Sequence, residues 1–104
     1  MTSRLMSSST ITGIDIGTHH IKVGITHAYE RNKNGPRVLG IGVAEARGLR
    51  HGYIVSVEDV TGSIKQAVAE AEKKAQVRVK KAFVSIGGIG LGSITSSSSV
   101  IISR

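Results

Sequence analysis

The chain has 104 residues, and with 39% hydrophobic and only three aromatic residues it is predicted to form one small domain with an aliphatic core. It contains no cysteine, which excludes disulfides and cysteine-based zinc sites. The 14 basic residues outnumber the 7 acidic ones, but they are scattered and no aromatic residues interleave with them, so we predict no nucleic-acid partner.

The first informative stretch, Ile11 to Thr26, reads ITGIDIGTHHIKVGIT and follows a serine-rich N-terminus that we predict to be a disordered tail over residues 1–9. The turn residues are Gly17, Thr18 and His19. Before them, Ile11, Gly13, Ile14 and Ile16 suggest a strand; after them, apolar residues at 21, 23 and 25 alternate with His20, Lys22 and Gly24, which is the period of a half-buried strand. The sequence therefore predicts a hairpin over about residues 10–26, with polar residues at its turn.

A polar loop with the turn signal Asn34–Gly35–Pro36 is predicted next. Residues 37–46 (RVLGIGVAEA) are typical of a third strand, antiparallel to the second because the connection is short. Residues 47–55 are predicted to be a loop.

A helix is predicted to begin after Ser56, which is a good N-cap residue with Asp59 three positions later. Its apolar positions form one small-residue stripe that indicates close packing on a sheet, and the basic end formed by Lys73 and Lys74 suits the helix dipole. The stripe consists of Val60, Ile64, Ala67, Val68, Ala71 and Ala75.

Residues 82–86 (AFVSI) are typical of a central parallel strand. The glycines that follow, from Gly87 to Gly92, predict a flexible connection or hinge, and Val100 to Ile102 predicts a last strand after a serine-rich segment. The resulting β-β-β-α-β order predicts an α/β fold of the ribonuclease-H-like type, incomplete as it stands.

The residues of the first turn suit phosphate chemistry. Gly17 allows close approach of an anion to backbone N–H groups, Thr18 supplies a hydroxyl and Lys22 a mobile positive charge. Asp15 would repel phosphate directly and is better suited to hold Mg²⁺ through water. A simpler interpretation, a turn glycine beside a solvated lysine, stays open from these residues alone.

Three motifs resemble known proteins. The D-I-G-T run, with Lys22 four residues after Thr18, resembles the first phosphate motif of the actin-like ATPase superfamily. The step that contains Arg47, Gly48, Leu49, Gly52 and Ile54, and the run A-F-V-S-I-G-G before a serine-rich strand, resemble the FtsA family of cell division proteins. The resemblance extends over about residues 12–104.

For the fold, the resemblance implies a first actin-like ATPase subdomain, of which residues 10–88 are the N-terminal part, and the start of an inserted subdomain at residues 89–104. For the site, it implies ATP with Mg²⁺: Asp15 would hold the metal through water. The phosphates would be bound by Gly17, Thr18, the His19 amide and Lys22. No catalytic residue is implied, and any ATPase activity would be weak and confined to the intact protein.

For the whole protein, the resemblance implies self-polymerisation and a link between the FtsZ ring and the inner face of the cytoplasmic membrane. The membrane contact would use a C-terminal helix that these 104 residues lack. We therefore expect an N-terminal fragment of a cytoplasmic, membrane-peripheral division protein, and no ATPase activity from this piece alone.

Two alternatives stay open at this point. A PilM-like pilus-assembly scaffold would share the fold and the ATP site. A metal-dependent nuclease of ribonuclease-H shape would use Asp15 as a metal ligand, with Glu45 and Glu58 as the nearby carboxylates. The histidines are interpreted as surface or turn residues and not as a metal site. They are His19, His20, His27 and His51.

Overall fold

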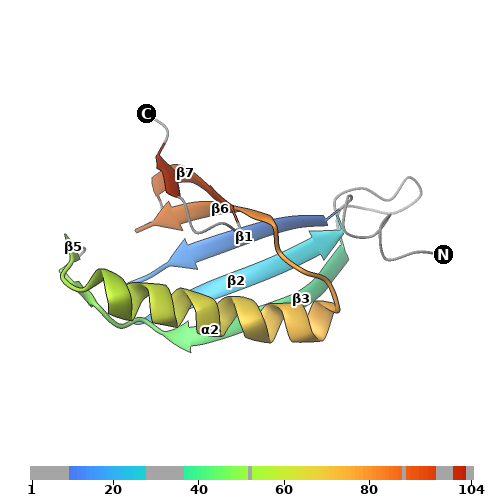
Figure 1. Cartoon of the computed structure of the whole chain (residues 1–104), viewed down its shortest axis with the longest axis horizontal. Helices are drawn as coiled ribbons and strands as arrows, with labels where there is room; N and C mark the ends of the chain where they lie inside the picture. Colours follow the sequence, from blue (N-terminus) through green and yellow to red (C-terminus); the bar gives the residue numbers. More distant parts are fainter. Residues whose placement is uncertain (1–9, 28–36, 52, 88, 96–99, 103–104) are drawn as a thin grey trace.

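The computed structural model describes residues 10–27, 37–51, 53–87, 89–95 and 100–102. Along the chain it contains β1 (Thr10–Ile16), β2 (His20–His27), β3 (Arg37–Glu45), β4 (Leu49–Arg50), β5 (Tyr53–Ile54), α2 (Val57–Ala75), β6 (Lys81–Ile86), β7 (Ile89–Thr95) and β8 (Val100–Ile102). Six strands form one sheet in the order β3-β2-β1-β6-β7-β8, and α2 crosses one of its faces (Figure 1). The fold is therefore mixed α/β, as predicted.

The predicted hairpin is confirmed, because β1 and β2 pair antiparallel from Thr10 opposite His27 to Ile16 opposite Ile21. In β2 every second side chain (Ile21, Val23 and Ile25) is buried, which is the pattern that the alternation predicts. In β1 the buried set is Thr12, Ile14 and Ile16, whereas Ile11 is exposed. The third strand is also confirmed: β3 pairs antiparallel with β2, with an irregularity in register between Ile25 and Thr26. The predicted tail and the Asn34–Pro36 turn lie outside the described residues.

Helix α2 begins and ends as its sequence predicts. The Ser56 hydroxyl accepts a hydrogen bond from the Asp59 N–H at 3.2 Å, which satisfies one of the free donors of the first turn. The helix ends at Gln76, whose φ of 59° is left-handed and whose N–H donates to the Glu72 carbonyl at 2.7 Å. Its buried face consists of Val60, Ser63, Ala67, Ala71 and Ala75.

Close packing of α2 on the sheet depends on two glycines of β3. A Cβ atom at Gly42 would overlap the backbone of Ala67, and one at Gly40 would overlap that of Ala71. The alanine stripe of the helix thus meets a sheet surface that has no side chains of its own at these two positions. The core beneath is aliphatic, with Ile21, Val23 and Ile25 as its largest fully buried side chains.

The segment from Arg47 to Val55 differs from the loop that was predicted. Leu49–Arg50 pairs with Tyr53–Ile54 to form a short two-stranded sheet. The turn before it requires Gly48, whose φ is +82° and whose carbonyl accepts from the N–H groups of Val55 and Ser56 at 2.7 and 3.1 Å. Two-residue strands are too short to leave a periodic signal in the sequence.

The predicted parallel strand is confirmed, because β6 lies beside β1 with Gly13 opposite Phe83 and Asp15 opposite Ser85. The predicted flexible connection after it is wrong. Strand β7 occupies Ile89–Thr95 and pairs antiparallel with β6, so Gly90 and Gly92 lie within a ladder. Backbone pairing with β6 outweighs the low strand propensity of glycine here. The predicted strand over Val100 to Ile102 is confirmed as β8.

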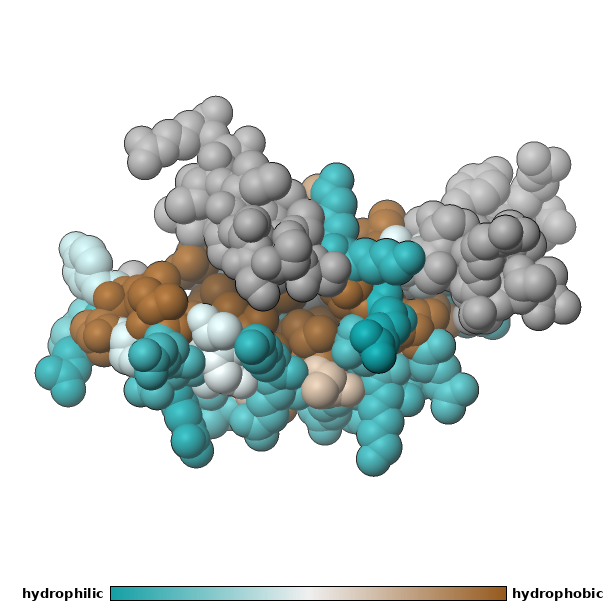
Figure 2. Space-filling view, viewed as in Figure 1, coloured by the Kyte–Doolittle hydropathy of each residue, from teal (hydrophilic) through white to brown (hydrophobic). Residues whose placement is uncertain are grey.

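The two faces of the sheet differ in their cover. On the face that packs against α2, the side chains of β1, β2 and β3 are buried, and hydrophilic side chains lie over the outer side of the helix along the lower edge of Figure 2. The opposite face, which we call the open face, carries large apolar side chains with relative exposures between 44% and 59%. They are Ile11, Val38, Ile41, Val43 and Phe83.

Candidate functional site

The candidate site is the turn between β1 and β2. Only Gly17, Thr18 and His19 separate the two strands, and the Gly17 N–H donates to the His20 carbonyl at 2.9 Å. The neighbouring strands hold the turn from both sides. The His19 carbonyl accepts from Ala46 at the end of β3 at 2.9 Å, and the Ile16 carbonyl accepts from Gly87 after β6 at 3.2 Å. The turn therefore has a defined position at one end of the sheet.

The turn exposes both side chains and backbone donors. Thr18 and His19 are exposed. Within the described part of the chain, the N–H groups of these two residues make no hydrogen bond to a carbonyl. Two consecutive unpaired N–H groups in a turn, beside a hydroxyl, are donors of the kind that anions accept.

Gly17 is suited to this turn because there is little room for a side chain, and not because the backbone angle is unusual. Its φ does not lie in the left-handed region, but a Cβ atom there would come within 3.0 Å of the His20 carbonyl oxygen. That carbonyl closes the turn through its bond to the Gly17 N–H. A side chain at this position would therefore push the two strand ends apart.

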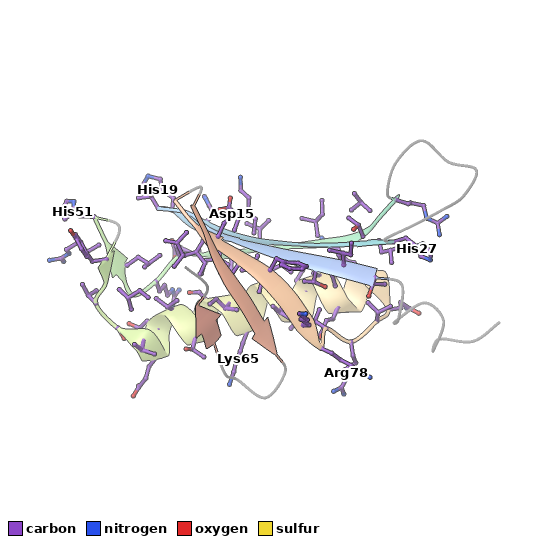
Figure 3. All side chains as sticks on the ribbon, turned by 90° about the horizontal axis from the view of Figure 1, so that it is seen from above. Asp15, His19, His27, His51, Lys65 and Arg78 are labelled. Carbon is purple, nitrogen blue, oxygen red and sulfur yellow. The ribbon has the colours of Figure 1, made fainter. Side chains whose placement is uncertain are left out.

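Asp15 and Lys22 are cross-strand neighbours on the open face. They are paired in the β1–β2 register and both are exposed. Figure 3 shows Asp15 on the side of the sheet away from α2, near the end where His19 lies. Among the described residues, the ion pairs are Arg47–Glu45 at 3.4 Å and Lys74–Glu70 at 3.7 Å, so Lys22 stays available to another anion.

Ser85 is a member of the site that the sequence did not reveal. Its hydroxyl donates to the Asp15 carboxylate (Oγ to Oδ1, 3.4 Å) across the parallel pair of β1 and β6. The two residues are 70 positions apart in the chain. Only the assumption that residues 82–86 lie beside β1, together with the exact register, could have placed this serine next to Asp15.

The remaining candidate residues do not assemble around Asp15. Glu45 pairs with Arg47 and lies at the end of β3, and Glu58 is exposed in the first turn of α2. In the part of the chain that the structure describes, no three histidine or carboxylate side chains come close enough together to hold a metal ion. The nuclease alternative, which needs further carboxylates beside Asp15, gains no support from this arrangement.

Among the described residues, no helix is both long enough and apolar enough to cross a bilayer.

Fold and site together define the class of protein. It is a mixed α/β protein in which one sheet, covered by a helix on one face, presents a polar hairpin turn with a hydroxyl, free N–H groups and a paired carboxylate and ammonium group at its end. No profile of a known protein family matches the chain. Comparison with curated proteins is more specific.

Seven curated proteins from diverse bacteria are similar to the chain, and all are named cell division protein FtsA. The protein of Pseudomonas aeruginosa is 36% identical over 93 residues, which cover 88% of this chain and 22% of that protein. The protein of Streptococcus pneumoniae is 34% identical over 77 residues (74% and 16%), and that of Bacillus subtilis 31% over 75 residues (72% and 16%).

The chain belongs to the FtsA family of cell division proteins. It spans between 16% and 22% of the length of the curated relatives that it matches. All seven share one name, so the pilus-assembly alternative is not favoured.

Proposed function

We propose that this chain is the N-terminal part of an FtsA-like, actin-related ATP-binding protein, and that the turn between β1 and β2 is half of its site for the phosphates of ATP. The observation that carries the proposal is that Thr18 and the free N–H groups of the turn lie at the end of the strands on which Lys22 pairs with Asp15. The chain that presents them belongs to the FtsA family. In this proposal residues 10–88 belong to a ribonuclease-H-like subdomain, and the inserted subdomain begins at residue 89.

Each residue of the turn has a defined part in this proposal. Thr18 donates from its hydroxyl and N–H to the β- and γ-phosphates, and His19 donates from its N–H. Lys22 offsets their charge, and Gly17 keeps the turn tight enough for the donors to converge. Asp15 holds Mg²⁺ through water, and Ser85 keeps its carboxylate oriented by donating to one oxygen.

Family membership supports a proposal for the role of the whole protein. As an FtsA-like protein it polymerises and connects the FtsZ ring to the inner face of the cytoplasmic membrane, through a C-terminal helix in the longer polypeptide. Nucleotide then acts mainly by shifting the balance between conformations that polymerise and those that do not, and hydrolysis is slow.

The 104-residue chain alone is expected to bind ATP negligibly. Its turn residues are exposed, so the phosphates would stay largely in water, and the contacts of one hairpin are too few to offset the loss of translational and rotational freedom. The test therefore needs the remainder of the site.

A chimera supplies that remainder. In the FtsA of Pseudomonas aeruginosa, this chain would replace the 93 residues that it matches, and Mg-ATP binding would be measured by calorimetry. We expect Lys22→Ala and Thr18→Val each to weaken ATP by at least about tenfold, because each removes a donor to a phosphate group. The control Lys65→Ala removes an exposed charge from α2 and should leave binding unchanged.

Adenosine binding and co-sedimentation with FtsZ filaments separate the proposed phosphate site from the proposed division role. The phosphate variants should lose less affinity for adenosine than for ATP, because adenosine has no phosphate for the turn to hold. A chimera that binds ATP equally well with and without Lys22 and Thr18 would overturn the proposed site. A chimera that binds ATP but fails to co-sediment with FtsZ filaments would leave the site in place and contradict the proposed division role.

A further inference from the structure

One short segment departs from the scattered distribution of basic residues along the chain. Residues 73–81, from the last turn of α2 to the first residue of β6, contain five basic residues and no acidic one. They are Lys73, Lys74, Arg78, Lys80 and Lys81, and all five are exposed. Like charges gathered in this way repel one another, and an anionic partner would relieve the repulsion.

The fold holds this segment in a defined position. The Glu72 carboxylate on α2 accepts a hydrogen bond from the Val79 N–H at 2.7 Å, which ties the connection between α2 and β6 to the helix. Val77 and Val79 pack against the core, whereas Arg78 and Lys80 are exposed. Because buried and exposed residues alternate here, the two basic side chains project from the same outer side of the connection.

Most of these charges are not neutralised by the part of the chain that the structure describes. Lys74 pairs with Glu70 at 3.7 Å. The other four basic residues, which we call the basic cluster, form no ion pair with a described carboxylate. They are Lys73, Arg78, Lys80 and Lys81. The cluster therefore presents up to four positive charges to a partner.

The basic cluster lies far from the turn between β1 and β2. Figure 3 shows Arg78 on the side of α2, toward the end of the sheet where His27 lies, with Asp15 and His19 at the other end. Strand β1 runs between these ends from Thr10 to Ile16, and at about 3.3 Å per residue it spans roughly 20 Å. This is more than twice the Debye length of about 8 Å at physiological ionic strength. An anionic surface at the basic cluster would therefore hardly repel phosphate groups at the turn.

The chemistry of the basic cluster favours a lipid surface over nucleic acid. Compact groups of lysine and arginine are attracted to membranes that contain anionic lipids. Proteins that bind single-stranded nucleic acid usually add several aromatic rings on which successive bases stack. Among the described residues, the one aromatic contact of the cluster is Lys81 over the Phe83 ring, at 6.0 Å from its centroid. A single ring is too few for such stacking.

We propose that the basic cluster binds the anionic headgroups of a membrane surface. The contact is electrostatic and reversible. It does not rest on the proposed ATP site, which lies at the other end of the sheet, and it is distinct from the C-terminal helix proposed for the longer polypeptide. With the cluster on the lipid, the turn between β1 and β2 points away from the membrane and stays open to nucleotide.

Co-sedimentation of the 104-residue chain with lipid vesicles tests the proposal. The vesicles contain either phosphatidylcholine alone or equal parts of phosphatidylcholine and phosphatidylglycerol. Each residue of the basic cluster should strengthen binding to the anionic vesicles by about fivefold, so we expect a preference over neutral vesicles on the order of several hundredfold at low salt. Raising the salt from about 0.05 to about 0.5 M should release the chain, because it screens the attraction.

Charge reversal locates the contact. The double variant Arg78→Glu with Lys80→Glu should weaken binding to the anionic vesicles by at least about tenfold. The matched control, Arg50→Glu with Lys65→Glu, makes the same change of charge at exposed positions on β4 and in the middle of α2, and should weaken binding by no more than about threefold. Arg78→Lys keeps the charge and should keep the binding. Far-UV circular dichroism checks that each variant is folded.

Several outcomes would overturn the proposal. They are a chain that does not bind anionic vesicles at low salt, one that binds neutral vesicles equally well, and equal losses in the two double variants. A DNA duplex bound through the same residues at least about tenfold more tightly than the vesicles would assign the cluster to nucleic acid instead. Failure here would leave the proposed ATP site intact, since Arg78→Glu with Lys80→Glu should not change ATP binding by the chimera.

Discussion

Strands β1, β2 and β3 carry two pairs of glycines, one pair on each face of the sheet, and their surroundings are opposite. On the covered face, Gly40 and Gly42 have the backbone of α2 so close that a Cβ atom at either position would overlap it. On the open face, Gly13 and Gly24 have nothing within 4 Å. On the covered face, glycine thus lets the backbone of α2 pack directly on the sheet. On the open face, it leaves the space above the strands unfilled.

The comparison shows why propensity alone misjudges glycine in strands. Glycine weakens an isolated strand, yet β3 contains two of them because a helix backbone needs their space. The alanines of α2 are the matching half of this contact, and a larger side chain on either side would force the layers apart. The following experiments test the difference between the faces, from the largest expected effect to the smallest.

Gly42→Val should destabilise the protein most. Its Cβ would overlap backbone atoms of Ala67, which cannot move without displacing α2, so we expect a loss of at least about 3 kcal/mol in the free energy of unfolding. The matched change Gly24→Val on the open face should alter stability by no more than about 1 kcal/mol, because the side chain enters empty space. Urea denaturation measures both, and equal losses would contradict the distinction.

Ile25→Ala should cost about 3 kcal/mol, because the side chain is fully buried and its removal leaves a cavity in the core. Ile11→Ala removes the same atoms from the open face, where the residue is 46% exposed, and should cost less than about 1 kcal/mol. Thermal unfolding of the two variants gives the comparison. A costly Ile11→Ala would mean that the open face is covered in the folded chain.

Ser56→Ala should lower stability by about 1 kcal/mol, since the first turn of α2 loses the acceptor that the Ser56 hydroxyl provides for the Asp59 N–H. Ser56→Asp restores an acceptor at the N-cap and should retain most of the stability. Chemical denaturation of the three proteins checks the cap, and a Ser56→Ala variant as stable as the parent would show that the helix is held by its packing alone.

The smallest effect is expected from Ile41→Thr on the open face of β3. The residue is 49% exposed and threonine keeps the β-branched shape, so the stability of the monomer should change by no more than about 0.5 kcal/mol. Urea denaturation measures the change, and a loss as large as that of Ile25→Ala would show that Ile41 is buried in the folded chain.

Much of the fold could be predicted from local patterns. Alternation identified β2, apolar runs identified β1 and β3, and the combination of Ser56, Asp59 and an alanine stripe identified α2. Strand β7 could not be predicted in this way, because Gly90 and Gly92 are typical of a loop and become a strand only by pairing with β6. The short pair of β4 and β5 was missed for a related reason: two residues are too few for a period.

The residues of the candidate site also fall into a group that the sequence predicts and one residue that only the structure reveals. Asp15, Gly17, Thr18, His19 and Lys22 lie within eight residues of one hairpin, so their proximity follows from the chain itself. Their proposed role in binding ATP stays a prediction. Ser85 comes from a strand that is distant in sequence, and its contact with Asp15 depends on the parallel register of β6.

By itself, the sequence determined strands β1, β2, β3, β6 and β8, the helix with its N-cap, and the polar turn, because each depends on neighbours a few residues away. Only the tertiary structure decided which glycines meet a helix, which face of the sheet stays open, and which serine reaches Asp15. Those features depend on the register and layering of segments far apart in the chain, and local periodicity carries no information about either.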